Sequence, residues 1–379
     1  MVFPFPAPPQ GLPRIKRPTT AYVYTEGGHY YAVDEHDHTI CYDSPTDCIQ
    51  EAINYVLSKG GGTVELGPGD YYFAPVTSVP PGNALIAINL QNYTWSSFRL
   101  KGQGYGTRLH FPVNNTSQNP IWMFTIGVPG ASDNAAVNPL PEIEGITFVN
   151  DMNNGSASFA PLVTYGNGGI GNGIILRDIQ VIDNPKAASG IQLVGNTWLN
   201  NMYGVLVEGF TYLSNNSSAW PGVITFDSVT LGKVIGGYFL HNASYGGLQG
   251  IALGVPTGTM LVSDTEIYGF GAAFGWSDSD GLTTLHVSNS IIGIPRSSTQ
   301  APSNNNAGIN YLLYNHGGNL YGKIFIENSW ISGYGINMSN QSGNIYVQIN
   351  NSWLYGPCGA NFIVNTTNSS GYVHIAKSR

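Results

Sequence analysis

One pattern recurs along most of this chain: a short alternation of apolar and polar residues that ends in a small or polar residue suited to a turn. Leu176-Arg177-Asp178-Ile179 and Ile326-Glu327-Asn328-Ser329 are two examples. From residue 140 onward, at separations of 18 to 39 residues, the turn position is occupied by Gly145, Asp178, Gly209, Asp227, Asp264, Asn289, Asn328 and Asn351. A period of about 30 residues, one supersecondary unit long, is typical of a solenoid.

The residue types at the turn position favour a β-helix over other repeat folds. Gly, Asn and Asp tolerate the left-handed backbone that a tight corner needs, and side-chain amides can bond from one coil to the next. Unequal separations also fit, because a long loop at one corner leaves the neighbouring coils undisturbed. The pattern therefore predicts an all-β fold, a single-stranded parallel β-helix, with a β-sandwich as the alternative.

One helix is predicted ahead of the repeats, over residues 45–59. Ser44 suits the N-cap, Pro45 the first helical position and Asp47 a capping-box-like pair, while Gly60 ends the helix. An apolar face follows at helical spacing, made of Ile49, Ala52, Ile53, Val56 and Leu57.

Residues 1–20 are rich in proline and show no periodicity, which is typical of an extended arm. We expect an arm or anchor over residues 1–42 and a β-helix domain over residues 43–379. The arm is either a disordered tail or a segment that docks on another subunit. Three cysteines, Cys41, Cys48 and Cys358, are too few for a disulfide framework or a zinc site, and Cys41 and Cys48 either pair locally or stay free.

The composition argues against two classes of partner. Only 9% of the residues are charged, the net charge is −8, and 14 Lys and Arg are spread thinly, so nucleic-acid binding through phosphate neutralisation is not expected. No apolar run of about 18 residues occurs, so no membrane span is predicted. The N-terminus lacks the pattern of a signal peptide. Either a leader has been removed, or the protein reaches the exterior by another route, such as assembly into a virus particle.

Two stretches resemble the pectate-lyase-like family of right-handed parallel β-helix proteins. The first contains Ile49-Gln50-Glu51-Ala52-Ile53, Gly60-Gly61-Gly62-Thr63-Val64 and Pro68-Gly69-Asp70-Tyr71. The second, Phe98-Arg99-Leu100-Lys101-Gly102-Gln103-Gly104-Tyr105-Gly106-Thr107, is similar to the family's "I-x-L-x-G-x-G-x-x-T". The resemblance implies that the helix caps one end of the β-helix core. It implies little about activity, because this scaffold carries lyases, hydrolases, virus tailspikes and inert spike proteins.

One candidate site combines two segments of a single repeat. Glu266 and Tyr268 follow the turn at Asp264, and Trp276, Asp278 and Asp280 come a few residues later. Sugar C–H faces pack on aromatic rings while carboxylates accept hydrogen bonds from hydroxyls, so Tyr268 and Trp276 are candidate glycan-binding residues. If the protein is an enzyme, Glu266, Asp278 and Asp280 are the candidate catalytic residues. The alternative is a solvated turn. Asp278-x-Asp280-Gly281 also resembles a calcium loop but lacks the downstream Glu, so we expect no cofactor, with calcium as the open alternative.

A second candidate site lies just before three successive turns, at Glu144, Arg177 and Glu208. Stacked strands lie about 4.8 Å apart, so these side chains are expected to alternate in charge across one face, either as a salt ladder or as a glycan-binding patch. A third cluster, His29, His36 and His38 beside Asp34, Glu35 and Asp37, is expected to be a solvated loop rather than a metal site.

These features favour a virion surface or spike protein that contacts host cell-surface glycans. The low charge, the abundance of Asn, Tyr and Ser and the proline-rich arm resemble virion proteins of archaeal viruses. Twelve Asn-x-Ser/Thr sequons point to glycosylation and an exterior location. The expected partners are a host polysaccharide or glycoprotein, other virion subunits through residues 1–20, and copies of this chain in a homo-oligomer such as a trimer. The alternative is a secreted polysaccharide hydrolase or lyase. Lyase chemistry normally needs a cluster of cations, and Arg177, Lys233, Arg296 and Lys323 do not gather on one predicted face.

Overall fold

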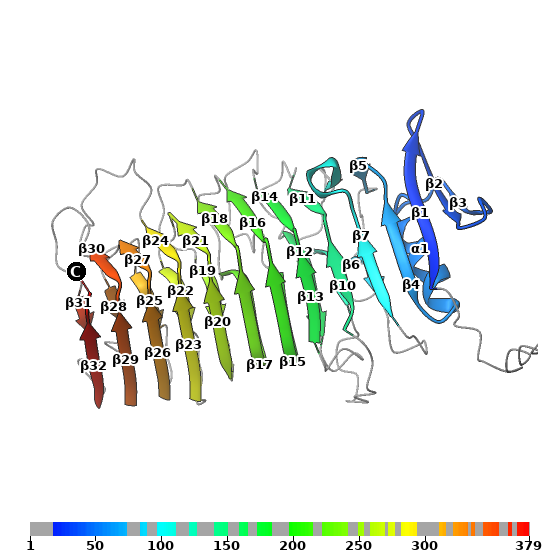
Figure 1. Ribbon diagram of the computed structural model, residues 1–379. Helices are drawn as coiled ribbons and strands as arrows, with labels where there is room; N and C mark the ends of the chain where they lie inside the picture. Colours follow the sequence, from blue (N-terminus) through cyan, green and yellow to red (C-terminus); the bar gives the residue numbers. More distant parts are fainter. Residues whose placement is uncertain are drawn as a thin grey trace, which may run out of the picture.

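Each sequence repeat folds into one coil of three β-strands, and the coils stack along a common axis (Figure 1). Strands of successive coils pair in parallel, so the solenoid has three faces. This computed structural model describes residues 18–73, 84–88, 97–110, 121–126, 140–150, 159–165, 173–183, 197–214, 222–241, 249–253, 258–269, 272–276, 282–293, 311–315, 321–332, 335–337, 344–355, 363–365 and 370–378.

The first face contains β4 (Gly62–Leu66), β7 (Phe98–Lys101), β10 (Glu142–Glu144), β13 (Gly173–Arg177), β20 (Thr259–Ser263), β23 (Leu282–Ser288), β26 (Tyr321–Glu327), β29 (Asn344–Asn350) and β32 (Ser370–Ala376). The second face contains β5 (Gly69–Tyr72), β8 (Thr107–His110), β11 (Thr147–Asn150), β14 (Gln180–Asp183), β16 (Thr211–Ser214), β18 (Tyr238–His241), β21 (Glu266–Tyr268), β24 (Ile291–Gly293), β27 (Trp330–Ser332) and β30 (Trp353–Tyr355). The third face contains β6 (Ala84–Ile88), β9 (Ile121–Ile126), β12 (Phe159–Tyr165), β19 (Gln249–Leu253), β22 (Ala272–Trp276), β25 (Tyr311–Asn315), β28 (Gly335–Asn337) and β31 (Ile363–Asn365). β15 (Thr197–Glu208) and β17 (Gly222–Ile235) continue from the third face into the first.

The core runs along the axis because alternate side chains of each strand point inward. On the first face one inward position is at most 1% exposed on every coil from β7 to β29, and it is filled by Leu100, Ile143, Leu176, Val207, Val234, Val262, Val287, Ile326 and Ile349. This stacked, parallel arrangement confirms the predicted parallel β-helix and contradicts the two antiparallel layers of a sandwich.

The corner between the first and second faces is the predicted turn column. The corner residues have φ between 46° and 66°, and they are Gly145, Asp178, Gly209, Gly236, Asp264, Asn289, Asn328 and Asn351. Corners bond from coil to coil: the Asp178 N–H donates to Glu208 O at 2.9 Å, and the Asn351 amide donates to Asn328 Oδ1 at 2.7 Å.

The assignment of Asp227 to this column was wrong. Asp227 lies inside β17, opposite Asn200 of β15, because β17 passes from the third face into the first without a break. The corner of that coil is Gly236, whose φ is 65° and whose N–H donates to Ser263 O at 3.1 Å.

A buried hydroxyl ladder runs beside the corner on the C-terminal coils. The Ser329 hydroxyl donates to Glu327 O at 2.8 Å and accepts a hydrogen bond from the Ser290 N–H at 3.2 Å. The same pair of bonds recurs at Thr265, Ser290, Ser352 and Ser378. Each hydroxyl therefore satisfies a backbone N–H of the preceding coil at the point where the strand ladder is interrupted.

Helix α1 (Ile49–Ser58) covers the N-terminal end of the core (Figure 1). Its predicted apolar face is buried, with Ile49, Ala52, Ile53, Val56 and Leu57 at most 1% exposed. The predicted start was wrong, because the helix begins at Ile49 rather than Pro45. The preceding residues form turns, in which the Ser44 hydroxyl accepts a hydrogen bond from the Cys48 N–H at 2.9 Å and donates to Glu51 at 3.0 Å.

Residues 19–42 form strands rather than an arm. β1 (Thr19–Glu26), β2 (His29–Asp34) and β3 (Thr39–Tyr42) pair in antiparallel order, and β1 also pairs in parallel with β4. There is thus no structural boundary at residue 42, and residues 1–17 of the expected arm lie outside the described residues. Cys41 and Cys48 form a disulfide that ties β3 to the start of α1, with their Cα atoms 5.6 Å apart.

Candidate functional site

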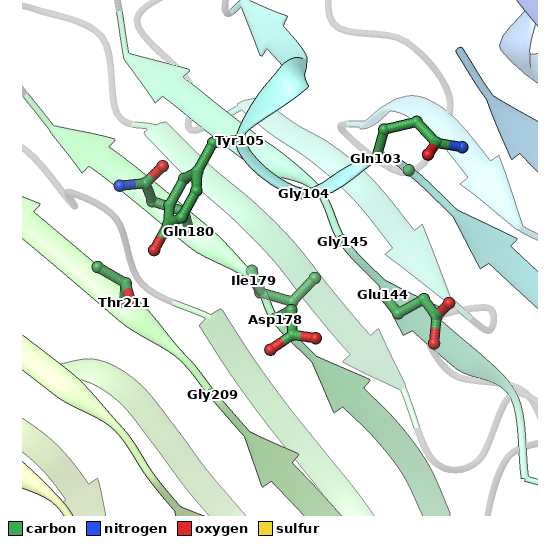
Figure 2. Close-up of a pocket in the computed structure, with 11 residues that line it drawn as sticks. Gln103, Gly104, Tyr105, Glu144, Gly145, Asp178, Ile179, Gln180, Gly209 and Thr211 are labelled. Atoms are coloured by element: carbon green, nitrogen blue, oxygen red, sulfur yellow. The ribbon is translucent and has the colours of Figure 1, made fainter. Parts of the chain in front are cut away.

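A pocket of about 390 Å³ opens at the corner between the first and second faces, over the coils from β7 to β16 (Figure 2). Its polar and aromatic lining consists of Gln103, Tyr105, Glu144, Asp178, Gln180 and Thr211, and the remaining lining is mostly glycine. The side chains come from four successive coils, so residues more than 100 positions apart in the chain meet here.

Glycines of the family-like motif let the chain after β7 close over the next corner. The Gly102 N–H donates to Glu144 O and the Gly104 N–H to Gly145 O, both at 2.8 Å. A Cβ atom on Gly102 would lie 2.2 Å from Gly145 O, so only glycine fits there. This close approach places η3 (Gly104–Gly106) at the edge of the pocket, with the Tyr105 ring 67% exposed.

Asp178 is an exposed residue that lines the pocket (Figure 2). Its backbone occupies the corner at φ 49°, and among the described residues its carboxylate has no hydrogen-bond or ion-pair partner. The neighbouring corner is Gly209, where a Cβ atom would lie 2.5 Å from Asp178 Oδ1. Asp178 Oδ1 therefore occupies the space that a Cβ atom at Gly209 would need, so glycine at the next corner lets the carboxylate lie there.

Gln180 and Thr211 occupy the same position on successive strands of the second face, two residues after their corners. The Gln180 Oε1 accepts a hydrogen bond from the Thr147 hydroxyl at 3.2 Å, which leaves the Gln180 amide NH₂ as a donor. The Gln180 side chain and the Tyr105 ring both line the pocket (Figure 2). The pocket thus combines an acceptor carboxylate, an amide donor, a hydroxyl and an aromatic ring.

Glu144 forms the wall of the pocket and belongs to an ion-pair network on the first face. Its carboxylate accepts a hydrogen bond from Arg99, and its Oε1 lies 3.7 Å from Lys101 Nζ. Glu142, on the same strand, pairs with Arg99 and with Arg177.

The predicted stacking of Glu144, Arg177 and Glu208 is present, because these residues are paired neighbours in the parallel register of β10, β13 and β15. Arg177 Nε lies 2.9 Å from Glu208 Oε2, but its other ion pair is with Glu142 rather than Glu144. Hydrogen bonding to Glu208 raises the pKa of the Arg177 guanidinium. These pairs form a ladder that continues from Glu208 back to Arg99 and Lys101.

Three residues of the other predicted site, Glu266, Tyr268 and Trp276, lie on strands of two different faces of one coil. Glu266 and Tyr268 lie on β21, where the Tyr268 hydroxyl donates to Glu266 at 3.0 Å and the Tyr268 ring packs edge-on against Tyr238. Trp276 ends β22 on the third face. Asp278, Asp280 and the Trp276 side chain lie outside the described residues.

The described histidine cluster is a hydrogen-bonded turn. Asp34 accepts hydrogen bonds from the backbone N–H groups of His36 and His38, from the His38 ring and from the Tyr55 hydroxyl. Although desolvation opposes the shift, these bonds lower the pKa of Asp34 to about 2. Among the described residues no three His, Cys, Asp or Glu side chains gather as a metal site. Within the residues that the structure describes, no helix is long and apolar enough to cross a membrane.

Comparison with known proteins adds little to this picture. No protein-family model and no curated protein sequence matches the chain. A solved structure, the A-module of a mannuronan C-5 epimerase from Azotobacter vinelandii, is similar at a TM-score of 0.23 and 12% sequence identity, covering 86% of this chain and 94% of that one. A similarity of this extent carries no argument about activity, and the fold rests on the strand pairing described above.

Sequence reasoning singled out Glu144 but not its partners in the pocket. Asp178 was predicted only as a turn residue of the repeats, and Gln103 and Tyr105 only as parts of a fold motif. A signal for Gln180 and Thr211 was present, since each follows its corner residue by two positions on consecutive repeats.

Proposed function

We propose that this protein is a glycan-binding β-helix displayed on a virus particle or outside a cell, and that the pocket around Asp178 is its binding site. The observation that carries the proposal is the meeting of an unpartnered carboxylate, an exposed tyrosine ring and an amide donor in one pocket, at Asp178, Tyr105 and Gln180. Pockets that bind sugars need this mixture, because a sugar presents an apolar C–H face and a ring of hydroxyls.

The scaffold supports binding by holding these groups in place. Asp178 sits on a corner whose backbone is hydrogen-bonded to the next coil, and Gln180 is bonded to Thr147. Groups that are already ordered lose little conformational entropy when a ligand binds, so a modest number of contacts can give useful affinity.

The ion-pair ladder has a supporting role in this proposal. Arg177 and Glu208 are paired with each other, and both are more than one-third exposed, so the pair contributes little to stability. The ladder holds the Glu144 carboxylate at the pocket wall through Arg99 and Lys101. Of the three residues predicted to bind a glycan here, Glu144 is therefore the one that reaches the pocket.

Polysaccharide cleavage is the second candidate function, because Glu144 and Asp178 bring two carboxyl groups to one pocket, as a glycosidase requires. One of the two must donate a proton to the leaving group. Both Glu144 oxygens already face cations, Arg99 and Lys101, so this side chain is poorly placed to do so. The arrangement favours binding over cleavage. Glu266, with Asp278 and Asp280, remains a separate proposed catalytic set that this pocket does not use.

The second part of the proposal is that the protein is displayed on a virus particle. Residues 1–20 attach the protein to other virion subunits, copies of the chain associate as a homo-oligomer such as a trimer, and the corner pocket faces a host polysaccharide or glycoprotein. Glycan binding of this kind needs no cofactor. Light scattering on the purified full chain tests the oligomer, and antibody labelling of intact particles tests the location.

The direct test is a glycan array probed with the wild-type protein, with Asp178→Asn and with Asp264→Asn. Asn occupies the same corner position on three other coils, so both variants keep the fold, and Asp264 lies outside the pocket. For the glycans that the wild type binds most tightly, we expect binding that drops about tenfold or more in Asp178→Asn and is unchanged in Asp264→Asn. Equal binding by all three proteins would place the glycan elsewhere, and release of shortened glycans by the wild type, lost in Asp178→Asn, would favour the enzyme.

A further inference from the structure

The charges around the pocket do not cancel. On the strands that border it, Arg99, Lys101 and Arg177 carry three positive charges, and each lies within ion-pair distance of Glu142, Glu144 or Glu208. Those three glutamates balance the three cations. Asp178 is left over, and its carboxylate is the group inside the pocket without a partner among the described residues.

An acidic sugar meets two obstacles in such a pocket. No Lys or Arg lines it, so a ligand carboxylate or sulfate would find no cation there. The nearby guanidinium and ammonium groups are already engaged with glutamates, so recruiting one would break an existing ion pair. Asp178 is itself negatively charged, and it would also oppose the approach of an anion.

A protonated amine meets the opposite situation. An ammonium group next to Asp178 would form a charge-assisted hydrogen bond, which is shorter and stronger than a neutral one. The exposed Tyr105 ring at the edge of the same pocket offers a second favourable contact for a cation through its π face. Gln180 and Thr211, which also line the pocket, can form hydrogen bonds with sugar hydroxyls.

We propose that the pocket selects glycans by charge: it prefers amino sugars with a free amine over neutral sugars and rejects uronic acid and sulfated polymers, with Asp178 as the specificity-determining residue. This inference rests on the proposed glycan-binding function and names the class of sugar that the site takes. It also sets this chain apart from polyuronate binding, for which a pocket of free cations would be needed.

The test compares three ligands of similar length on the purified full chain by calorimetry: a chitosan oligomer with free amines, a neutral chitin oligomer and an acidic oligogalacturonate. The buffer is mildly acidic, so that the amine of the chitosan oligomer is protonated, and the salt concentration is varied. The proteins are the wild type, Asp178→Asn and the matched corner control Asp264→Asn.

We expect the wild type to bind the chitosan oligomer at least about tenfold more tightly than the chitin oligomer, and the oligogalacturonate most weakly. In Asp178→Asn the amine preference disappears while chitin binding stays, and in Asp264→Asn the preference is retained. Added salt weakens chitosan binding and leaves chitin binding unchanged, because only the former contains a charge pair.

Wild-type binding of the oligogalacturonate as tight as that of the chitin oligomer would overturn the charge selection and leave glycan binding itself intact. An amine preference that persists in Asp178→Asn would overturn the role of Asp178. If none of the three ligands binds, the selection is wrong, and the glycan array then shows separately whether the proposed function fails with it.

Discussion

Replacing Ser329 with alanine tests whether the buried hydroxyl ladder holds the coils together. Ser329 is 2% exposed, and its hydroxyl joins two coils by donating to Glu327 O and accepting from the Ser290 N–H. Alanine fills nearly the same volume, so the substitution removes hydrogen bonds without creating a large cavity. The Glu327 carbonyl keeps a bond from the Asn289 N–H at 3.1 Å, whereas the Ser290 N–H loses its partner.

The expected cost follows from that single orphaned donor. Leaving a buried N–H without a partner destabilises a protein by about 1–3 kcal/mol, so we expect the free energy of unfolding to fall by about 2 kcal/mol. Ser329→Thr is the matched control that retains the hydroxyl, since Thr265 occupies the same position on another coil. Ser263→Ala, on the outward side of β20, should change stability by less than about 0.5 kcal/mol.

Urea unfolding followed by circular dichroism measures the loss, and hydrogen exchange measures it locally. Because a solenoid can open coil by coil, the Ser290 amide is the better probe. Its exchange should accelerate about 30-fold in Ser329→Ala, which is the factor that corresponds to 2 kcal/mol. Unchanged protection of the Ser290 amide, together with a loss below about 0.5 kcal/mol, would refute the reasoning that the ladder satisfies the interrupted strand pairing.

Two further predictions concern the N-terminal end and the pocket. Asp47 is 3% exposed, and burial, with smaller contributions from Asp43 and Glu51, raises the pKa of its carboxyl to about 7. The unfolded chain loses this proton near pH 4 and the folded chain only near pH 7. The free energy of unfolding should therefore fall by roughly 4 kcal/mol as the pH rises from 4 to 7, and it should stay constant at higher pH. Thermal unfolding across this pH range should show a flatter profile for Asp47→Asn, and an equally steep one would contradict the assignment. Gly102→Ala should destabilise by about 1–3 kcal/mol and disturb the pocket, because its Cβ would lie 2.2 Å from Gly145 O. Gly106→Ala is the control in the same thermal melts, since its Cβ would meet only ordinary contact at 3.6 Å, and equal losses in both variants would argue against the close approach.

The fold could be predicted from the sequence because the corner pattern recurs in successive coils. Each corner needs a residue that accepts a left-handed backbone, and the positions of Asp178, Asp264 and Asn289 display that requirement directly. The misassignment of Asp227 shows the limit of this signal. The pattern at residues 225–228 matches a corner locally, but whether a strand stops or continues there depends on its neighbours in the sheet, and β15 pairs with β17 from Ile224 to Ile235.

The start of the helix shows a similar limit. Ser44 has the properties of an N-cap and does accept a hydrogen bond from the Cys48 N–H, yet the chain makes turns before α1 begins at Ile49. The disulfide between Cys41 and Cys48 and the packing of β3 determine where these residues lie. Such contacts join segments that local propensity treats separately.

The amino-acid sequence alone determined the class of the fold, because the corner residues and the alternation of apolar side chains are local requirements met again in every coil. Only the tertiary structure decided where a ligand could bind. Tyr105, Asp178 and Thr211 become neighbours through the stacking of coils, and the distance along the axis is set by strand pairing rather than by separation in the chain. The tertiary structure also decided which carboxylate has no partner among the described residues, because the ion pairs of Arg99 and Arg177 join side chains from different coils.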